Sequence, residues 1–278
     1  MRVQTMALGL LMACLFGCTE IGPVITSLEP GSPGSGGQSA PQMVLIEEFS
    51  GVRCVNCPAG SAELEQLAKI YPGRLVVVSI HAGFFSNPYA ENRYDFRTAE
   101  GNNLINLLGQ PLGYPSAVVN RKKFEGETDL QLSRTQWAGF IAQELNKTST
   151  VDLKVTSTFN AGTRELRADV DVKRLDNLAD PGTLRLSVFL TENDIQDTQL
   201  TPEGKKDDYL HRHVLRKALT PFDGAPVGGE LTAVGVSVRR SFVFTMPQGW
   251  RPEACMLVAA VHRSGDSWEV LQAAGKSL

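Results

Sequence analysis

The stretch that decides the fold reads Val44-Leu45-Ile46-Glu47-Glu48-Phe49-Ser50-Gly51-Val52-Arg53-Cys54-Val55-Asn56-Cys57. Its first half is a hydrophobic run typical of a β-strand, and the glycine marks a short turn. Apolar residues then recur at helical spacing over residues 62–71, with charged residues between them. We therefore predict a strand, a turn and a helix, with a Cys-x-x-Cys where the helix begins.

Two cysteines three residues apart at the start of a helix either bridge as a disulfide or stand open as a dithiol. The N-terminus of a helix carries partial positive charge, which stabilises a thiolate and lowers its pKa. This order of elements is typical of a thioredoxin-like redox site. We expect Cys54, exposed at the helix start, to attack a disulfide as a thiolate, and Cys57, one turn deeper, to resolve the mixed disulfide.

Two charged residues flank the cysteines. Glu48 lies six residues before Cys54, where thioredoxins carry a buried acidic residue that accepts the proton of the resolving thiol. Burial beside the sulfurs would raise the pKa of Glu48 and make it a base, whereas the alternative is a strand-end carboxylate in water. Arg53 stands where thioredoxins usually carry tryptophan, and its charge should favour a Cys54 thiolate. Glu47 should point to the opposite face.

A Gly-x-Pro ending at Pro115 precedes a β-branched run, which is where thioredoxin-like folds place a cis-proline beside the sulfurs. We expect Pro115 to lie against the cysteine pair, and the backbone of Tyr114 to bind a substrate chain as an extra strand. The other elements predicted before residue 148 are a central strand at 74–81, an irregular rim insertion at 84–103, a short helix at 102–108, a hairpin end with a solvated basic run at 121–126, and a closing helix at 129–147.

The N-terminal residues predict a signal that targets the protein to the cell envelope. Residues 6–17 form an apolar run too short to span a bilayer, after a positive Arg2. The run ends in Leu15-Phe16-Gly17-Cys18, which resembles the bacterial lipobox, and a plain signal peptide cut elsewhere is the alternative. Residues 30–41, rich in proline, glycine and serine, predict a flexible spacer. We therefore expect lipidation at Cys18 and anchoring to the outer membrane, with the facing leaflet left open.

From about residue 150 the pattern changes to alternation of apolar and polar residues, which indicates strands with one buried face. Several such short strands, separated by turn signals, suggest an immunoglobulin-like (Ig-like) sandwich. The predicted fold is thus an α/β thioredoxin-like domain followed by an all-β Ig-like sandwich. The predicted ranges are a signal peptide at 1–17, a lipidated linker at 18–41, the thioredoxin-like domain at 42–148 and the sandwich at 149–278.

His211 and His213 form a further candidate pair. Two histidines at i and i+2 on a strand share a face and could chelate a metal, but two ligands alone are too few. A third would have to come from Asp207, Asp208 or His81. Because the Cys-x-x-Cys pattern favours redox chemistry, we predict no cofactor and no metal. We expect the histidine pair to form hydrogen bonds at the domain interface, and metal binding by His211 and His213 is the alternative.

Composition and the remaining cysteine add limits. The formal net charge of −3 over 278 residues gives no electrostatic case for nucleic acid. Cys255 lies in an apolar run, and a lone cysteine in a strand core behaves as a small hydrophobe. We read it as structural.

The combination of motifs resembles the outer membrane protein twenty-eight family, which comprises thioredoxin-like lipoproteins of Gram-negative bacteria. The resemblance implies a thioredoxin-like domain followed by an all-β domain at the outer membrane. It implies no single activity, since members are also described as surface or adhesin-like proteins. The matching motifs are Glu47-Glu48-Phe49, Cys54-Val55-Asn56-Cys57-Pro58-Ala59-Gly60, Val78-Ser79-Ile80-His81-Ala82-Gly83, Tyr114-Pro115, Val119-Asn120-Arg121 and Tyr209-x-His211-x-His213-Val214-Leu215-Arg216.

The leading hypothesis is a thiol–disulfide oxidoreductase that acts on envelope or surface proteins carrying thiols or disulfides. The alternative is a surface-binding or adhesin-like module in which the cysteine pair is a structural bridge. A catalytic Cys54 should be exposed with a lowered pKa, whereas a structural bridge should resist mild reductant.

Overall fold

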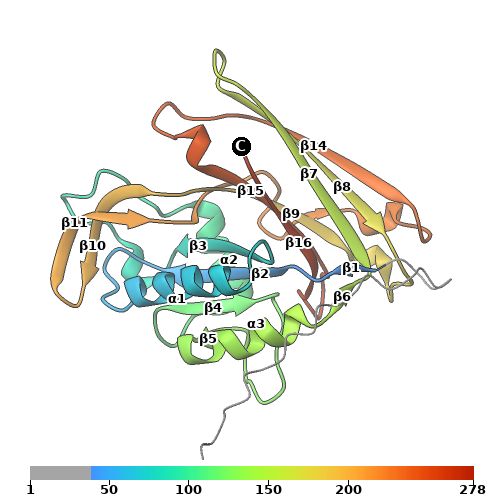
Figure 1. Ribbon diagram of the computed structural model, residues 1–278, viewed down its shortest axis with the longest axis horizontal. Helices are drawn as coiled ribbons and strands as arrows, with labels where there is room; N and C mark the ends of the chain where they lie inside the picture. The colour runs from blue at the N-terminus through green and yellow to red at the C-terminus, as the bar shows by residue number, and fades with distance from the viewer. Residues whose placement is uncertain (1–38) are drawn as a thin grey trace, which may run out of the picture. The chain divides into compact units, whose positions relative to one another are not determined.

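A nine-stranded mixed sheet runs through residues 39–278, the part of the chain that the computed structural model describes (Figure 1). β2 (Val44–Ser50) and β3 (Leu75–His81) pair in parallel through the crossover helix α1 (Cys57–Ile70). β4 (Ser116–Val119) runs antiparallel to β2, and β5 (Leu132–Ser133) antiparallel to β4. The predicted strand–turn–helix unit is therefore confirmed.

Both faces of β2 are covered, so every residue of this strand is buried. On one face, apolar residues of α1 and α3 (Trp137–Leu145) pack around Val44 and Ile46. On the other face, α2 (Ala99–Leu108) and strands from later in the chain pack around Leu45 and Phe49. A strand enclosed on two sides needs a near-continuous hydrophobic run, which is the pattern that its sequence shows.

The same sheet continues into the second half of the chain. β12 (Val214–Ala218) pairs in parallel with β3, and the Ser79 N–H donates to the His213 carbonyl at 2.7 Å. β9 (Arg185–Glu192), β15 (Cys255–His262) and β16 (Val270–Ser277) extend the sheet from β12. Strands from the two predicted ranges, 42–148 and 149–278, thus share one sheet.

A three-stranded antiparallel sheet packs over this second half. It consists of β7 (Val151–Asn160), β8 (Glu165–Arg174) and β14 (Ser237–Thr245), in the order β14-β8-β7. Its inner face forms one apolar cluster with β9 and β15. The described residues are accordingly mostly β-sheet with few helices, and none of these helices is long and apolar enough to cross a membrane.

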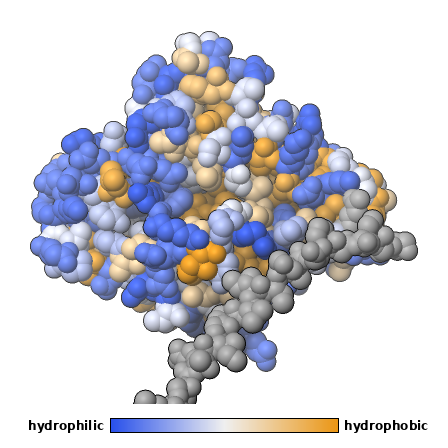
Figure 2. Space-filling model, viewed as in Figure 1, coloured by the Kyte–Doolittle hydropathy of each residue, from blue (hydrophilic) through white to orange (hydrophobic). Residues whose placement is uncertain are grey.

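The structure also contains a two-stranded hairpin that the sequence did not predict. It consists of β10 (Ile195–Thr201) and β11 (Gly204–His211), and its outer surface is hydrophilic (left of Figure 2). The short elements are β1 (Ala40–Pro41), β6 (Thr148–Ser149), β13 (Ala225–Pro226) and 3-10 turns at Phe84–Ser86, Arg134–Gln136, Pro181–Thr183, Gly228–Glu230 and Pro252–Ala254.

The predicted helices differ from the observed ones at their starts. The helix predicted at 129–147 is shorter, because Leu132 pairs with β4 and Ser133 then forms a capping box with Gln136. The helix predicted at 102–108 begins earlier, because the Thr98 hydroxyl caps it by accepting a hydrogen bond from the Gly101 N–H at 2.9 Å.

The basic run predicted to lie in solvent is partly buried instead. Arg121 is enclosed and forms a bidentate ion pair with Glu47, at 2.8 Å from Nε to Oε2 and 2.6 Å from Nη2 to Oε1. A carboxylate on a fully buried strand requires a partner of opposite charge, because desolvation of a lone charge costs several kcal/mol, of order 3–5 when a partner is removed. Arg121 supplies that partner.

Substitution Arg121→Leu should therefore lower the free energy of unfolding by about 3–5 kcal/mol, because it leaves Glu47 buried and unpaired. Urea unfolding followed by circular dichroism measures this loss. Arg239→Leu is the control. Arg239 lies on β14 and forms an exposed ion pair with Asp171 of β8, so its loss should leave stability unchanged. Equal effects of the two substitutions would contradict the assignment.

Candidate functional site

The two cysteines stand at the N-terminal end of α1 and form a disulfide. Cys57 is the first residue of the helix, and Cys54 lies in the preceding turn, with 5.4 Å between the Cα atoms. The Cys57 N–H donates to the Cys54 carbonyl at 3.3 Å, and Pro58 follows in the first turn of the helix. The sulfurs are thus held at the positive end of the helix dipole, where a thiolate is stabilised.

Both cysteines are buried in this oxidised form, with exposed fractions of 3% for Cys54 and 1% for Cys57. The expected exposure of Cys54 is therefore wrong. Hairpin β10–β11 causes this burial: the Gln199 side-chain amide donates to the Cys54 carbonyl at 3.0 Å, and the Leu200 N–H donates to the Val52 carbonyl at 2.8 Å. The cover comes from a segment about 145 residues further along the chain.

Glu48 is buried on the α1 side of the sheet, which excludes a strand-end carboxylate in water. Burial raises the pKa of Glu48 to about 7, and hydrogen bonds from Ser79 and Ser61 partly oppose that rise. Ser79 is its register partner on β3, and the Ser61 hydroxyl donates to Oε1 at 3.4 Å. The carboxyl group thus has no cationic partner and can exchange a proton near neutral pH.

The peptide bond between Tyr114 and Pro115 is cis, as the sequence predicts. A Cβ placed on Gly60 of α1 would lie 2.7 Å from Pro115 Cγ and 3.1 Å from Glu48 Oε1. Only glycine therefore allows the helix to approach the proline and the carboxyl group this closely. The cis-proline, Glu48 and the helix that carries Cys57 meet at this point.

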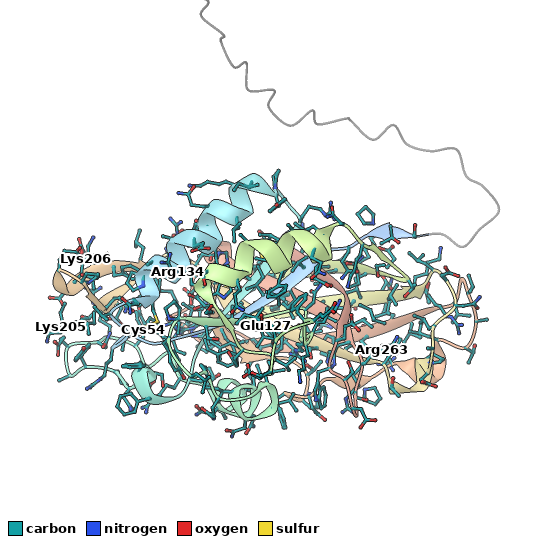
Figure 3. The ribbon with its side chains drawn as sticks, turned by 90° about the horizontal axis from the view of Figure 1, so that it is seen from below. Cys54, Glu127, Arg134, Lys205, Lys206 and Arg263 are labelled. Carbon is teal, nitrogen blue, oxygen red and sulfur yellow. A yellow bond between two sulfur atoms is a disulfide. The ribbon has the colours of Figure 1, made fainter. Side chains whose placement is uncertain are left out.

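A groove of about 640 Å³ lies beside the cis-proline. Asn56, between the cysteines, lines it together with most residues of the segment 127–136. Tyr114 also lines it and donates its hydroxyl proton to the Ala82 carbonyl at 3.0 Å. Leu112 at the groove is fully exposed. In Figure 3, Cys54 lies between the hairpin that carries Lys205 and Lys206 and the side of the groove that carries Arg134 and Glu127.

Arg53 is exposed but directed away from the cysteines. Its guanidinium donates to the Asn87 and Pro88 carbonyls, both at 2.7 Å, and lies over the Tyr89 ring at 4.5 Å. The side chain therefore fixes the loop at 87–89 against the Cys-x-x-Cys turn.

His211 and His213 do not share a strand face, so this expectation is wrong. β11 ends at His211, and His213 has a φ of 54° in the turn that follows. His211 is buried, whereas the His213 ring lies 3.2 Å from a carboxylate oxygen of Glu65. Within residues 39–278, no group of three or more His, Cys, Asp or Glu residues could hold a metal ion.

Sequence reasoning missed Gln199 and Tyr209 as residues of the site. Tyr209 lines a small cavity beside Cys57 and lies near Glu48 and Ser61. The hairpin that carries both residues has a polar, irregular sequence without clear alternation. Its only signal was the Tyr209-x-His211 motif, which gave no position in space.

The sequence profile of outer membrane protein Omp28 matches residues 108–277, more than half of the chain. The chain belongs to the Omp28 family. Membership places this Omp28-family chain at the outer membrane, as predicted. The predicted lipid attachment site, Cys18, lies outside the described residues. Comparison with curated proteins finds no match.

Two solved structures resemble the Omp28-family chain in fold. HBP35 of Porphyromonas gingivalis is 19% identical and aligns over 86% of this chain and 76% of that chain, with a TM-score of 0.69. A protein from Agrobacterium tumefaciens is 16% identical over 86% of this chain and 95% of that chain, with a TM-score of 0.51. At these identities the likeness shows the fold alone.

The raised pKa of Glu48 makes the stability of the oxidised protein depend on pH. Below the ordinary pKa of 4.5 the carboxyl is protonated in both the folded and the unfolded state, so burial costs little. As the pH rises through about 7, the unfolded state gains from ionisation that the folded state resists, and this stability is lost.

Glu48→Gln removes this dependence. Between pH 4 and pH 8, the free energy of unfolding of the variant should rise by about 3 kcal/mol relative to that of the unsubstituted protein. Urea unfolding of the oxidised proteins at both pH values measures the change. Glu125→Gln, at an exposed carboxylate, is the control and should show no such change. A pH-independent difference for Glu48→Gln would contradict the shift.

Proposed function

We propose that this chain carries a thioredoxin-like site and catalyses thiol–disulfide exchange on envelope or surface proteins. One observation carries the proposal: the Cys54–Cys57 disulfide stands at the N-terminus of the helix that cis-Pro115 and the buried Glu48 both approach at Gly60. A bridge that serves stability alone has no need of a carboxyl group that titrates near neutral pH, because burying that group costs stability.

In the proposed mechanism, Cys54 is the nucleophile and Cys57 the resolving thiol. Oxidation of a partner begins when a partner thiolate attacks the Cys54 sulfur and Cys57 leaves as a thiolate. The protonated form of Glu48 then supplies a proton to Cys57, and in the reverse direction its carboxylate accepts that proton. A pKa of about 7 suits both directions at neutral pH.

The groove beside the cis-proline is the proposed docking place for the partner chain. Asn56 lines this groove and Val55 beside it is exposed, whereas the hairpin closes the opposite side. A partner in the groove would thus contact the Cys-x-x-Cys turn at Asn56. The Tyr114 backbone would pair with an extended partner segment, and Arg53 would act by fixing the adjacent loop.

The proposed organisation is an α/β thioredoxin-like part followed by an Ig-like sandwich. β2, α1, β3, β4 and α3 form the first part, and the packing of β7, β8 and β14 over β9 and β15 supports the second. Lipid attached at Cys18 would anchor both parts to the outer membrane and restrict the site to partners within reach of that membrane.

A second candidate is a surface-binding module in which the pair is a structural bridge. The burial of both sulfurs and the hydrogen bond from Gln199 to the Cys54 carbonyl favour it, since access controls the reactivity of a disulfide. The two candidates differ in the reduction potential of the pair and in the reactivity of Cys54.

Exchange activity predicts different behaviour for the two single-cysteine variants. Cys57→Ser should trap a mixed disulfide at Cys54 when oxidised glutathione is added, because the resolving thiol is missing, whereas Cys54→Ser should trap much less. Mass spectrometry of the intact protein measures the adduct. Cys255→Ser is the control: burial raises the pKa of Cys255 to about 12, so it should not react.

The reduction potential separates the candidates. A value between about −270 and −120 mV is expected of an exchanger. A potential below about −300 mV, together with an unreactive Cys54, would reject the enzyme and leave the binding module.

A further inference from the structure

A small cavity of about 10 Å³, which shares no lining residue with the groove, lies beside Cys57. Cys57 lines it together with His81 from the end of β3 and His211 from the end of β11. The two imidazole rings lie edge to face, with 5.7 Å between their centroids. The cavity thus joins one sulfur of the pair to one histidine from each half of the chain.

Both histidines are buried and lack the hydrogen bonds that buried rings normally make. Among residues 39–278, no group hydrogen-bonds either ring nitrogen of His81 or Nε2 of His211. Desolvation lowers the pKa of His81 to about 3 and that of His211 to about 4, so both rings are neutral at pH 7. Unsatisfied buried polar atoms are rare in native proteins, and a redox or catalytic role is one of the explanations for them.

The two rings offer complementary groups to the cavity. Nε2 of His211 has no partner, and we assign the proton of the neutral ring to Nδ1, on the side of the Asp197 and Thr198 backbone, which leaves Nε2 as a bare acceptor. A neutral His81 always carries one N–H and has no acceptor for it. The cavity therefore presents an unused donor on His81 and an unused acceptor on each ring, of which the His81 donor and the His211 acceptor form a complementary pair.

A thiol matches this pair of groups better than a disulfide does. A disulfide sulfur has no proton to donate, whereas a thiol donates through S–H and accepts through sulfur. We propose that His81 and His211 are positioning residues that hydrogen-bond Cys57 only in the reduced state: His81 donates N–H to the sulfur, and His211 Nε2 accepts the S–H. This deepens the proposed function and rests on it. Stabilising the reduced form makes the pair a stronger oxidant of its partners.

The reaction balances with glutathione as the reductant. One glutathione thiolate attacks the Cys54 sulfur, the Cys54–Cys57 bond breaks, and Cys57 leaves as a thiolate that takes a proton. A second glutathione thiolate attacks the glutathione sulfur of the mixed disulfide and releases Cys54 and oxidised glutathione. Two electrons pass to the pair, and the two protons lost by the glutathione thiols are bound by the two cysteines.

The test is the redox equilibrium of the full-length protein in detergent with mixtures of reduced and oxidised glutathione at pH 7. Alkylation of free thiols followed by mass spectrometry gives the reduced fraction. His81→Leu and His211→Leu should each lower the equilibrium constant for reduction about tenfold, which corresponds to a potential about 30 mV more negative. His81→Gln retains an N–H donor and should stay within about threefold of the unsubstituted protein.

His262→Leu is the matched control. His262 is equally buried, but both of its ring nitrogens have partners, Ser187 Oγ at 2.9 Å and the Arg263 carbonyl at 2.7 Å, and it does not line the cavity. Loss of a buried histidine as such should therefore leave the equilibrium unchanged. If a leucine variant fails to fold, the phenylalanine variant at the same position replaces it, because phenylalanine keeps an aromatic ring and has no hydrogen-bonding nitrogen.

The outcomes separate this inference from the proposed function. If glutathione reduces the native pair but both leucine variants have the same equilibrium constant for reduction, the rings do not favour the reduced state. That outcome overturns the inference and leaves the proposed function intact. If no glutathione mixture reduces the native pair, the proposed function fails and the inference fails with it.

Discussion

Two adjacent carboxylates on a strand with no access to water are the constraint on which the structure depends. Glu47 and Glu48 point to opposite faces of β2, and the energetic cost of burying each carboxyl group is reduced in a different way. Arg121 neutralises Glu47 through a bidentate ion pair. Glu48 has only hydroxyl partners and instead keeps its proton up to about pH 7. Glu47 is thus stabilised as an ion by a buried arginine, whereas Glu48 is protonated over a wider pH range than an exposed carboxyl group.

The second half of the chain is part of the site rather than an appendage to it. Parallel pairing of β3 with β12 joins the halves. The Ser79 N–H of β3 also donates to the carbonyl of His213, the residue directly before β12. Because the sheet is continuous, hairpin β10–β11 is held over the Cys-x-x-Cys turn, where Gln199 and Leu200 bond its carbonyls. Asn56 of the same turn lines the cis-proline groove. Access to the disulfide is thus set by residues far from it in sequence.

The residues around the cysteines divide into two environments. On one side, Asn56 and Tyr114 line the groove, where Leu112 is exposed. On the other side, His81 and His211 line a small polar cavity together with Cys57. Hydrogen bonds are stronger in such a low-dielectric space, and unsatisfied ones cost more. A difference in hydrogen bonding between the oxidised and reduced states therefore translates directly into a redox preference.

The sequence by itself determined the strand–turn–helix unit, the helix-start position of the cysteine pair, the cis peptide at Pro115 and most C-terminal strands, because these depend on local periodicity and on residue-specific backbone preferences. Only the tertiary structure decided the burial of Cys54, the pairing of Arg121 with Glu47, and the separate positions of His211 and His213. These features arise from contacts between residues 74 or more positions apart, as with Glu47 and Arg121, or from the point where a strand happens to end. Local pattern carries no information about such contacts, since they depend on how the whole sheet is assembled.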